Sequence, residues 1–484
     1  MKKEKFQPVI GLEIHVELKT NSKMFCSCPN NFDSETNVNI CPICLGHPGT
    51  LPVINDKAVR KVIKTGLALN CEIAKISKFD RKNYFYPDLP KGYQVSQYDM
   101  PLCKNGFLEI MGKKIRIRRI HLEEDAGKLT HSDKDYSLVD FNRAGVPLME
   151  LVTEPDIRSA EEAIKFAKEL QLILRYLEIS DADMEKGHMR IEVNISLSKG
   201  GLKKADLSSV RAEIKNLNSF KAVEGAIQYE VKRQTDILNN NEKVIQETRG
   251  WDAIKRKTIS QRKKEEAHDY RYLPDPDLPI LTFTDKEINE IKKDIPELPS
   301  EKREKLISFY NLKAQNVEFF VQDQEMNCFF EDVISLLKKN ASQDKLVRAI
   351  NLTVNYLTTD VKGLINKTGK RMKISSSNFA EFILLINNQK ISSKIAKNVL
   401  DKMFNTGEKP SSIIKKEGLS CMDDEQEIRN IVNDVLLKNQ KATTDFKAGK
   451  ENALQFLIGQ VMAQTKGRAD LKKVTSFLKE EMKN

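Results

Sequence analysis

The stretch VIGLEIHVEL, Val9–Leu18, alternates apolar and polar side chains along its whole length. Successive side chains of an extended strand point to opposite faces, so this period of two predicts a β-strand with one apolar and one polar face. The apolar face would carry Ile10, Leu12, Ile14, Val16 and Leu18, and the polar face Gly11, Glu13, His15 and Glu17. Taken alone, the polar face is equally compatible with a functional surface and with the solvated side of a sheet.

A second segment repeats this pattern. Arg190, Glu192 and Asn194 alternate with apolar residues, which predicts another strand with one apolar and one functional face. Glu150 is a single carboxylate inside the apolar segment Pro147–Val152. Strands of this kind would supply carboxylates to a common sheet face.

The segment Ile115–Lys128 contains an irregularity. Its alternation slips near Arg118 and Arg119 and then resumes, as a β-bulge would cause. Bulges re-aim side chains, and three consecutive acids follow this one: Glu123, Glu124 and Asp125.

Carboxylates that gather with one histidine suit a divalent cation. Mg²⁺ takes oxygen ligands and keeps several waters, so two or three carboxylates with nucleotide phosphates would hold it. His15 is a less usual partner, and it would bind the ion directly, bind it through water, or act as an acid or base. The candidate residues lie far apart in sequence, so this hypothesis requires their strands to meet.

The cysteines give a sharper pattern. Cys26-x-Cys28 and Cys41-x-x-Cys44 are separated by a short segment, and nearby prolines and a glycine supply turns. This spacing predicts a four-thiolate zinc knuckle, and four thiolates leave no open position for catalysis. The alternative is that the four are incidental thiols.

Cations and aromatic rings are interleaved between Lys78 and Tyr86, where Lys82 is one candidate for an anion contact. Such a run can hold phosphate and stack a base, or its rings can simply belong to a core. No Walker A motif is present, because the segment Gly363–Lys370 has the wrong glycine spacing and Arg371 follows it. Any use of ATP would therefore depend on a carboxylate-lined sheet.

The chain has 484 residues, of which 40% are hydrophobic and 31% charged. This length predicts two or three domains, and this composition excludes a disulfide-stapled miniprotein, a disordered chain and a fibrous one. The net charge is +11, and most of the excess lies after residue 300, which favours a polyanionic partner or a solubilising surface.

The first six residues are mostly charged, and no segment is apolar for long enough to cross a bilayer. We therefore expect a cytoplasmic protein without a membrane partner. In that reducing compartment cysteines serve as thiols or metal ligands rather than as disulfides.

The pattern along the chain predicts an α+β protein of three units. Residues 1–295 mix strands with a few helices, residues 296–405 form a helical connector, and residues 410–484 form a small helical tail. Within the first unit, Ser159 and Glu162 have the spacing of a capping box, which predicts a core-packing helix that begins there. A second helix is predicted around residues 226–238.

Longer strings then match a known family. The chain resembles the B subunit of the bacterial tRNA-dependent amidotransferase over essentially its whole length. The resemblance is carried by VIGLEIHVEL, KFDRKNYFYPDLPKGYQVSQ (Lys78–Gln97), HLEEDAGK (His121–Lys128), LVDFNRAGVPLMEL (Leu138–Leu151), EIKNLNSF (Glu213–Phe220) and DYRYLPDPDLP (Asp269–Pro279). The segment Asp445–Asp470 is similar to the YqeY-like tRNA-binding domain of that family.

The resemblance implies an ATP-dependent carbon–nitrogen ligase of protein biosynthesis. It would convert Glu-tRNA(Gln) or Asp-tRNA(Asn) to the amidated tRNA through an acyl phosphate. Its partners in a heterotrimer would be an A subunit with glutaminase activity, which channels ammonia, together with a small C subunit. The first domain would be a glutamine-synthetase-like cradle.

The resemblance also implies roles for single residues. The catalytic group would be Glu13, His15, Glu123, Glu124 and Glu150, with Mg²⁺ on His15, Glu124 and Glu150. Lys82 and Arg190 would contact anionic groups of ATP or tRNA, and Cys26, Cys28, Cys41 and Cys44 would hold structural zinc. The tRNA contacts would be Lys447, Lys450, Lys466 and Arg468. Glu192 departs from the shorter Asp of many relatives, which puts a ligand role there in doubt.

Two alternatives remain at this stage. A nonenzymatic zinc-containing RNA-binding protein would explain the cysteines and the tail but leave the acids without a purpose. A freestanding glutamine-synthetase-like ligase would explain the acids but not the basic helical tail. The choice among Glu-tRNA, Asp-tRNA or both as substrate is not encoded in these patterns.

Overall fold

The structure is a computed structural model in which residues 6–31, 33–131, 135–199, 210–263, 270–340, 342–419, 422, 424–447, 450–465 and 468–482 are described. The chain forms two compact units, Met1–Pro299 and Ser300–Asn484. The first is built on strands and the second is helical within the described residues, so the predicted α+β class is confirmed. The finer division into three units stays a prediction.

A large mixed sheet organises the first unit. In the described residues it has nine strands, in the order β14-β13-β12-β11-β1-β10-β7-β6-β2, and β12 and β13 form its parallel pair. Its members are β1 (Phe6–Glu17), β2 (Glu72–Ile73), β6 (Cys103–Ile110), β7 (Lys113–Glu124), β10 (Pro147–Thr153), β11 (Met189–Lys199), β12 (Ala212–Leu217), β13 (Glu247–Asp252) and β14 (Lys257–Lys263). The predicted strand at Val9–Leu18 is the fifth in this order and therefore central.

Within the described part of the chain, three small sheets accompany the large one. They consist of β3 (Ile76–Ser77) with β16 (Leu281–Thr282), of β4 (Asp80–Asn83) with β5 (Tyr93–Ser96) and β15 (Leu273–Pro274), and of β8 (Lys128–His131) with β9 (Ser137–Asp140). The Gln94 side chain of β5 donates a hydrogen bond to the Glu124 carbonyl oxygen at 2.8 Å. This contact places the β4–β5 pair beside the end of β7.

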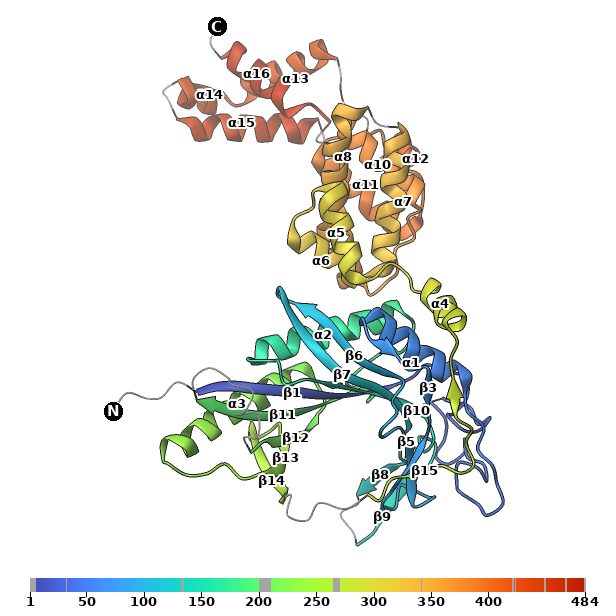
Figure 1. Ribbon diagram of the computed structural model, residues 1–484. Helices are drawn as coiled ribbons and strands as arrows, with labels where there is room; N and C mark the ends of the chain where they lie inside the picture. Colours follow the sequence, from blue (N-terminus) through green and yellow to red (C-terminus); the bar gives the residue numbers. More distant parts are fainter. Residues whose placement is uncertain are drawn as a thin grey trace. The chain divides into compact units, whose positions relative to one another are not determined.

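Helices α1 (Asp56–Ala68), α2 (Ala160–Tyr176) and α3 (Phe220–Asn239) cover one face of the sheet (Figure 1). The apolar side chains of β1, Ile14 among them, share one buried core with Phe166 of α2 and Ile227 of α3. Gly66 lets α1 approach closely, because an added Cβ there would lie 2.4 Å from the Cys103 sulfur of β6. The opposite face of the central strands carries the polar side chains.

The two predicted helices of this unit are confirmed as α2 and α3. The Ser159 hydroxyl accepts a hydrogen bond from the Glu162 backbone N–H at 3.1 Å, as expected of an N-cap. The predicted capping box is only half formed, because the Glu162 carboxylate accepts from the Arg158 backbone N–H instead. Lys113 of β7 also binds this carboxylate and draws it toward the sheet.

A short helix, α4 (Asp285–Lys293), precedes the second unit, whose helices are α5 (Pro299–Tyr310), α6 (Ala314–Gln322), α7 (Gln324–Asn340), α8 (Gln343–Asn355), a π-helical turn (Tyr356–Val361), α9 (Lys362–Thr368), α10 (Ser376–Asn387), α11 (Ser393–Thr406), α12 (Pro410–Glu417), α13 (Glu425–Lys438), α14 (Gln440–Lys447), α15 (Glu451–Gln464) and α16 (Leu471–Glu481). Helix α11 ends at Gly407 in the left-handed conformation and Pro410 begins α12, so a helix break lies between the predicted units 296–405 and 410–484. Among the described helices, none has the length and hydrophobicity that a membrane span requires.

Candidate functional site

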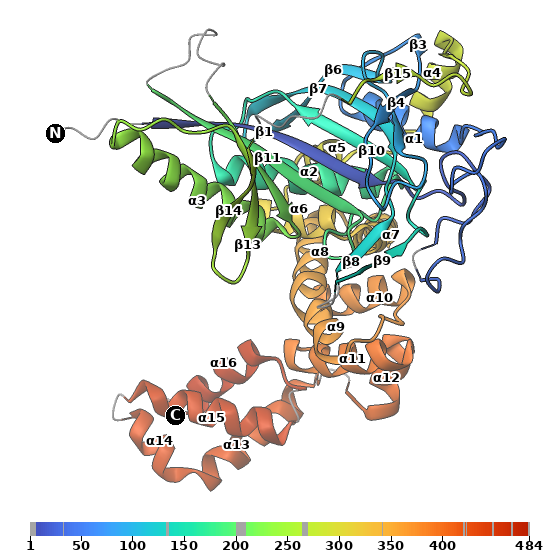
Figure 2. The ribbon, with the colours of Figure 1, turned by 90° about the horizontal axis from the view of Figure 1, so that it is seen from below.

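The polar face of the large sheet forms the floor of a cleft of about 810 Å³. The central strands β7, β10, β1, β11 and β12 are hydrogen-bonded neighbours, and Figure 2 shows β1, β10 and β11 side by side. Side chains of the β4–β5 pair and the segment that joins its strands, including Lys82, Tyr84 and Gln94, also line the cleft. The cleft therefore brings together residues from distant parts of the first unit that the sequence singled out.

Strand register aligns four charged or polar residues across the cleft floor. His15 of β1 is the partner of Glu150 on β10 and of Arg190 on β11. Glu150 is in turn the partner of His121 on β7. The row Arg190, His15, Glu150 and His121 thus crosses four adjacent strands, which confirms that the predicted polar faces meet.

Two carboxylates and two imidazoles make the first cluster on this floor. The His15 Nε2 atom lies 3.6 Å from Glu123 Oε1 and 3.4 Å from Glu150 Oε2. The His121 Nε2 atom lies 3.7 Å from Glu123 Oε2 and 3.5 Å from Glu150 Oε2, so the two rings hold the carboxylates between them. One ligand atom each of His15, Glu123 and Glu150 lies close enough to the others to share a metal ion.

The electrostatics of this cluster follow from its burial. Burial alone would lower the pKa of His15, but the hydrogen bond and charge of Glu150 outweigh burial and raise it to about 9. Burial alone would raise the pKa of Glu150, yet His121 and His15 together hold it below its usual range. Glu150 is therefore charged at neutral pH and stabilises positive charge at this point.

A second acidic cluster lies beside the first. Glu13 of β1, Glu192 of β11 and Glu213 of β12 place ligand atoms near one another. Lys215 of β12 pairs with them, its Nζ atom lying 2.7 Å from Glu192 and 3.4 Å from Glu213. Burial raises the pKa of Glu13, and the charges of Glu150 and Glu192 raise it further. This crowding of carboxylates favours a bound cation.

The alternation patterns of the sequence did not predict this second cluster. Glu213 and Lys215 lie two residues apart in β12 and share a face, a spacing that would have suggested a polar strand face. Glu192, whose ligand role the resemblance put in doubt, does reach this cluster. His121 was likewise quoted within a motif but not singled out.

Glu124 does not join either cluster, contrary to the expectation that it shares an ion with His15 and Glu150. Val152 pairs with Arg119 and Thr153 with Ile117, so the predicted bulge is present and leaves Arg118 without a register partner. Beyond the bulge the alternation of β7 is shifted by one residue, so Glu123 points into the cleft. Glu124 points to the opposite side of the strand. Its carboxylate accepts the Val95 backbone N–H at 2.9 Å and pairs with Lys91.

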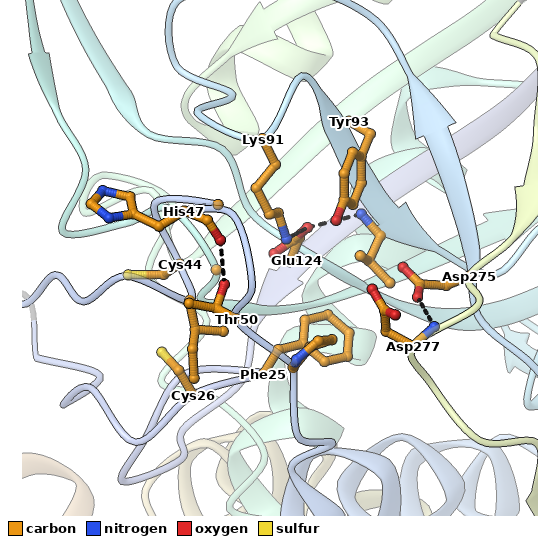
Figure 3. A pocket seen from close by; sticks show the side chains of 15 residues that line it. Phe25, Cys26, Cys44, His47, Thr50, Lys91, Tyr93, Glu124, Asp275 and Asp277 are labelled. Atoms are coloured by element: carbon orange, nitrogen blue, oxygen red, sulfur yellow. Dashed lines mark hydrogen bonds and ion pairs between the residues drawn. The ribbon is translucent and has the colours of Figure 1, made fainter.

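A small pocket of about 70 Å³ lies on that side of the strand (Figure 3). Lys91, Tyr93 and Glu124 line one part of it, and Cys26 and Cys44 line another. Glu124 therefore belongs to the surroundings of the cysteines, whereas Glu123 belongs to the cleft.

The four predicted cysteines do come together. Sulfur atoms of Cys26, Cys28, Cys41 and Cys44 all lie within 4.8 Å of one another, which is close enough to hold a metal ion. The Cys44 sulfur also accepts the Cys41 backbone N–H at 3.2 Å. A hydrogen bond with Cys26 lowers the pKa of Cys44, and the charge of the nearby Lys23 ammonium lowers it further.

The predicted anion-binding residues differ in their surroundings. The Lys82 ammonium lies 4.8 Å from the centre of the Tyr270 ring and 5.5 Å from that of Tyr84, and it forms no ion pair within the described ranges. Arg190 lines the cleft as well, but its Nη2 atom lies 2.6 Å from Asp125. Lys82 is thus the freer of the two cations.

The basic residues assigned to tRNA lie in the helical unit. Lys447 ends α14 and is exposed, whereas Lys450 pairs with Asp445 at 2.9 Å. Arg468 donates a hydrogen bond to the Thr465 carbonyl oxygen at 3.2 Å. Lys466 lies outside the described residues. Their assignment to tRNA stays a prediction.

Comparison with known proteins finds families and relatives that match this chain. The GatB/GatE catalytic domain family matches residues 8–289, and the GatB domain family matches residues 336–482. A protein of Thermoanaerobacter pseudethanolicus, named as the B subunit of an aspartyl/glutamyl-tRNA(Asn/Gln) amidotransferase, is 47% identical over 485 residues, 99% of both chains. A Persephonella marina protein with the same name is 47% identical over 487 residues, which cover 99% of this chain and all of that protein.

Proposed function

Because this chain belongs to the GatB/GatE family, we propose that it is the transamidating subunit of a tRNA-dependent amidotransferase, a ligase that converts misacylated Glu-tRNA(Gln), Asp-tRNA(Asn) or both. The observation that carries this proposal is the pair of acidic clusters on one cleft floor, His15, Glu123 and Glu150 beside Glu13, Glu192 and Glu213. The reaction takes place in the cytoplasm, where aminoacylated tRNA is used.

The chemistry explains why such a floor is needed. A side-chain carboxylate is a poor electrophile at neutral pH, so ammonia cannot displace its oxygen directly. The carboxylate oxygen therefore attacks the γ-phosphorus of ATP, ADP leaves, and an acyl phosphate forms. Ammonia then attacks the carbonyl carbon, inorganic phosphate leaves with the C–O electron pair, and the nitrogen loses a proton. Both steps pass through crowded negative charge, so catalysis consists of positioning and charge neutralisation.

The residues on the floor fit Mg²⁺. The donor set is rich in carboxylate oxygens, and the cluster at Glu192 and Glu213 already attracts the ammonium of Lys215. His15, Glu123 and Glu150 would hold one ion, and Glu13, Glu192 and Glu213 a second. Bound Mg²⁺ would neutralise phosphate oxygens during phosphoryl transfer. Glu123 takes the role first assigned to Glu124, because it is the acid that faces His15.

Cations and rings at the edge of the cleft would orient the nucleotide or the tRNA end. Lys82 has an ammonium without an ionic partner among the described residues, so it can pair with a phosphate. Tyr84 and Tyr270 meet edge to face at 5.7 Å beside it and offer a surface for a base. Arg190 would hold Asp125 and the cleft floor in place rather than bind the substrate itself.

The four-cysteine cluster fits zinc. Its soft thiolate donors come from two close pairs, and four such ligands make a closed, structural site. The helical tail would contribute to binding the tRNA body. The partners of the chain would be the glutaminase and the small C subunit, since the relatives are named as the B subunit of an amidotransferase.

A nonenzymatic RNA-binding role is less favoured, because it gives no purpose to two acidic clusters on the floor of one cleft. The test is to purify this chain with its two partner subunits and supply ATP, Mg²⁺, glutamine or ammonium, and each misacylated tRNA in turn. We expect ADP to form only with a misacylated tRNA and the amidated aminoacyl-tRNA to accumulate. Tight tRNA binding without ADP or amide formation would overturn the proposal.

A further inference from the structure

Lys23 is a lysine without access to solvent. Its exposed fraction is 0%, and its ammonium lies 3.8 Å from the Cys44 sulfur and 3.2 Å from the Phe141 carbonyl oxygen. Within the described residues it forms no ion pair with a carboxylate. The sulfur of Cys44 is therefore its nearest candidate for an anionic partner.

The backbone fixes Lys23 at this place. Its own N–H donates to the Cys28 carbonyl oxygen at 3.0 Å, and the N–H of Met24 donates to the Gly145 carbonyl oxygen at 2.7 Å. A Cβ added at Gly145 would lie 3.6 Å from both the Lys23 and the Cys44 side chains. The lysine is thus enclosed between the cysteine cluster and the segment that leads into β10, the strand of Glu150.

A buried ammonium is strongly unfavourable unless it faces a negative charge, and a neutral thiol is a weak acceptor. Four thiolates around a divalent ion carry a net charge of two minus, and this excess would satisfy the ammonium. We propose that Lys23 is the built-in counter-charge of the four-cysteine metal centre and couples metal occupancy to the segment Phe141–Gly145. This inference rests on the proposed zinc site.

The coupling between metal occupancy and the segment Phe141–Gly145 predicts what loss of either partner does to the other. When zinc leaves, no ion holds the four sulfur atoms together, so the compact negative charge that faces Lys23 is dispersed. Lys23 then stays buried with the Phe141 carbonyl oxygen as its fixed hydrogen-bond acceptor. Loss of the metal therefore destabilises the entry to β10, and loss of the lysine weakens the hold on the metal.

The first test measures zinc affinity of the full chain by competition with a chromogenic chelator. We expect Lys23→Met to weaken zinc binding about 10- to 100-fold, the range known for groups that support metal ligands. Lys57→Met is the matched control, because Lys57 is exposed on α1 and its loss removes the same charge. Equal affinity of the Lys23→Met and control variants would overturn the inference.

The second test uses the sign of the change in melting temperature. In the zinc-loaded chain Lys23→Met should lower the melting temperature. In a Cys44→Ser background freed of metal the same substitution should raise it, because it removes an uncompensated buried charge. A decrease in both backgrounds would mean that Lys23 acts independently of the thiolates and would overturn the inference.

A metal assay on the unmodified chain distinguishes a failure of the proposed zinc site from a failure of the counter-charge role of Lys23. If the reconstituted chain holds no stoichiometric zinc, both the zinc site and the counter-charge fail. If it holds zinc and Lys23→Met binds it equally well, only the counter-charge fails.

Discussion

Glu123 and Glu124 are consecutive residues of β7, yet their carboxylates lie on opposite faces of the sheet. Glu123 lies 3.6 Å from His15 in the cleft, whereas Glu124 pairs with Lys91 beside the cysteine cluster. The two acids differ by one position and share the same chemistry. Substituting Glu123 therefore tests the role of the cleft, and substituting Glu124 tests the role of the opposite side of the strand.

Replacing Glu123 by Gln should abolish ATP-dependent activation of the misacylated tRNA. The substitution keeps the shape of the side chain but removes a negative charge from the cluster with His15 and Glu150. We expect ADP formation to fall by at least about 100-fold, since even groups that only support metal ligands cost up to that much. The measurement is ADP release with saturating tRNA, and tRNA affinity should stay unchanged.

Glu109→Gln is the control for this variant, because Glu109 is exposed on β6 and its substitution removes the same charge. Turnover by Glu123→Gln equal to that of the control would remove Glu123 from the proposed metal site.

Glu124→Gln should behave differently. It leaves the largely buried Lys91 ammonium opposite a neutral amide, so the melting temperature should fall. The Mg²⁺ concentration that gives half-maximal ADP formation should not change, because this side chain does not face the cleft. A several-fold rise in that concentration would instead support the sequence-based assignment of Mg²⁺ to Glu124.

The contrast between Glu123 and Glu124 shows which features the local sequence pattern could predict and which it could not. The slip near Arg118 predicted a bulge, and the bulge is present. Which of the following acids reaches the cleft depends on which residue the neighbouring strand β10 leaves unpaired, and that is a property of the pairing. The same holds for Glu213, whose cluster requires β12 to lie beside β11.

Long amphipathic elements were predictable because their signal is local. The alternation of β1 and the apolar stripe of α2 are complete within one segment. Strands of two residues, such as β2 and β15, have no pattern of their own and exist through their partners. The surroundings of Lys23 were equally invisible, because residues more than a hundred positions away help to enclose it.

Glu230 of α3 is a fully buried carboxylate at the centre of an ion network, and Glu230→Gln should destabilise the first unit by about 3 kcal/mol at pH 7. The carboxylate binds Arg233 at 2.9 Å and Arg249 at 3.1 Å, and the substitution leaves these two partly buried cations to share Glu247 as their remaining carboxylate partner. Urea unfolding followed by the fluorescence of Trp251, the single tryptophan, measures the change. The exposed Glu224→Gln on the same helix should shift stability by less than about 0.5 kcal/mol.

The difference in stability between the wild type and Glu230→Gln should depend on pH in a definite direction. Burial alone would raise the pKa of Glu230, but hydrogen bonds from Arg233 and Thr258 outweigh it and lower the pKa. A lowered folded-state pKa stabilises the protein above the unfolded value of about 4.3. This stabilisation is lost as the pH falls through the folded-state pKa. The gap between wild type and Glu230→Gln should therefore narrow below pH about 4, and a gap that widens there would contradict the network.

Removal of the tail should weaken tRNA binding while it leaves the rest of the chain folded. The last four helices, α13 to α16, enclose an apolar core whose members all lie between Met422 and Met482. Helix α12 packs instead against α10 and α11, so the tail should be removed after residue 419 rather than from residue 410, where the sequence pattern predicted it to begin. A chain that ends at residue 419 loses the complete core of α13 to α16 and exposes little of the core of the preceding helices.

The salt dependence of binding decides whether this tail touches tRNA phosphates. Each phosphate contact that is lost should make the slope of log affinity against log salt shallower by about 0.7 to 0.9. We therefore expect the shortened chain, assembled with its two partner subunits, to bind tRNA more weakly and with a shallower slope. Glutamine hydrolysis by the complex should continue. Lys447→Gln in the full chain should lower the slope by roughly one contact, since its ammonium is exposed at the end of α14. If the slope is unchanged in both the shortened chain and Lys447→Gln, the tRNA contacts must lie in another part of the protein.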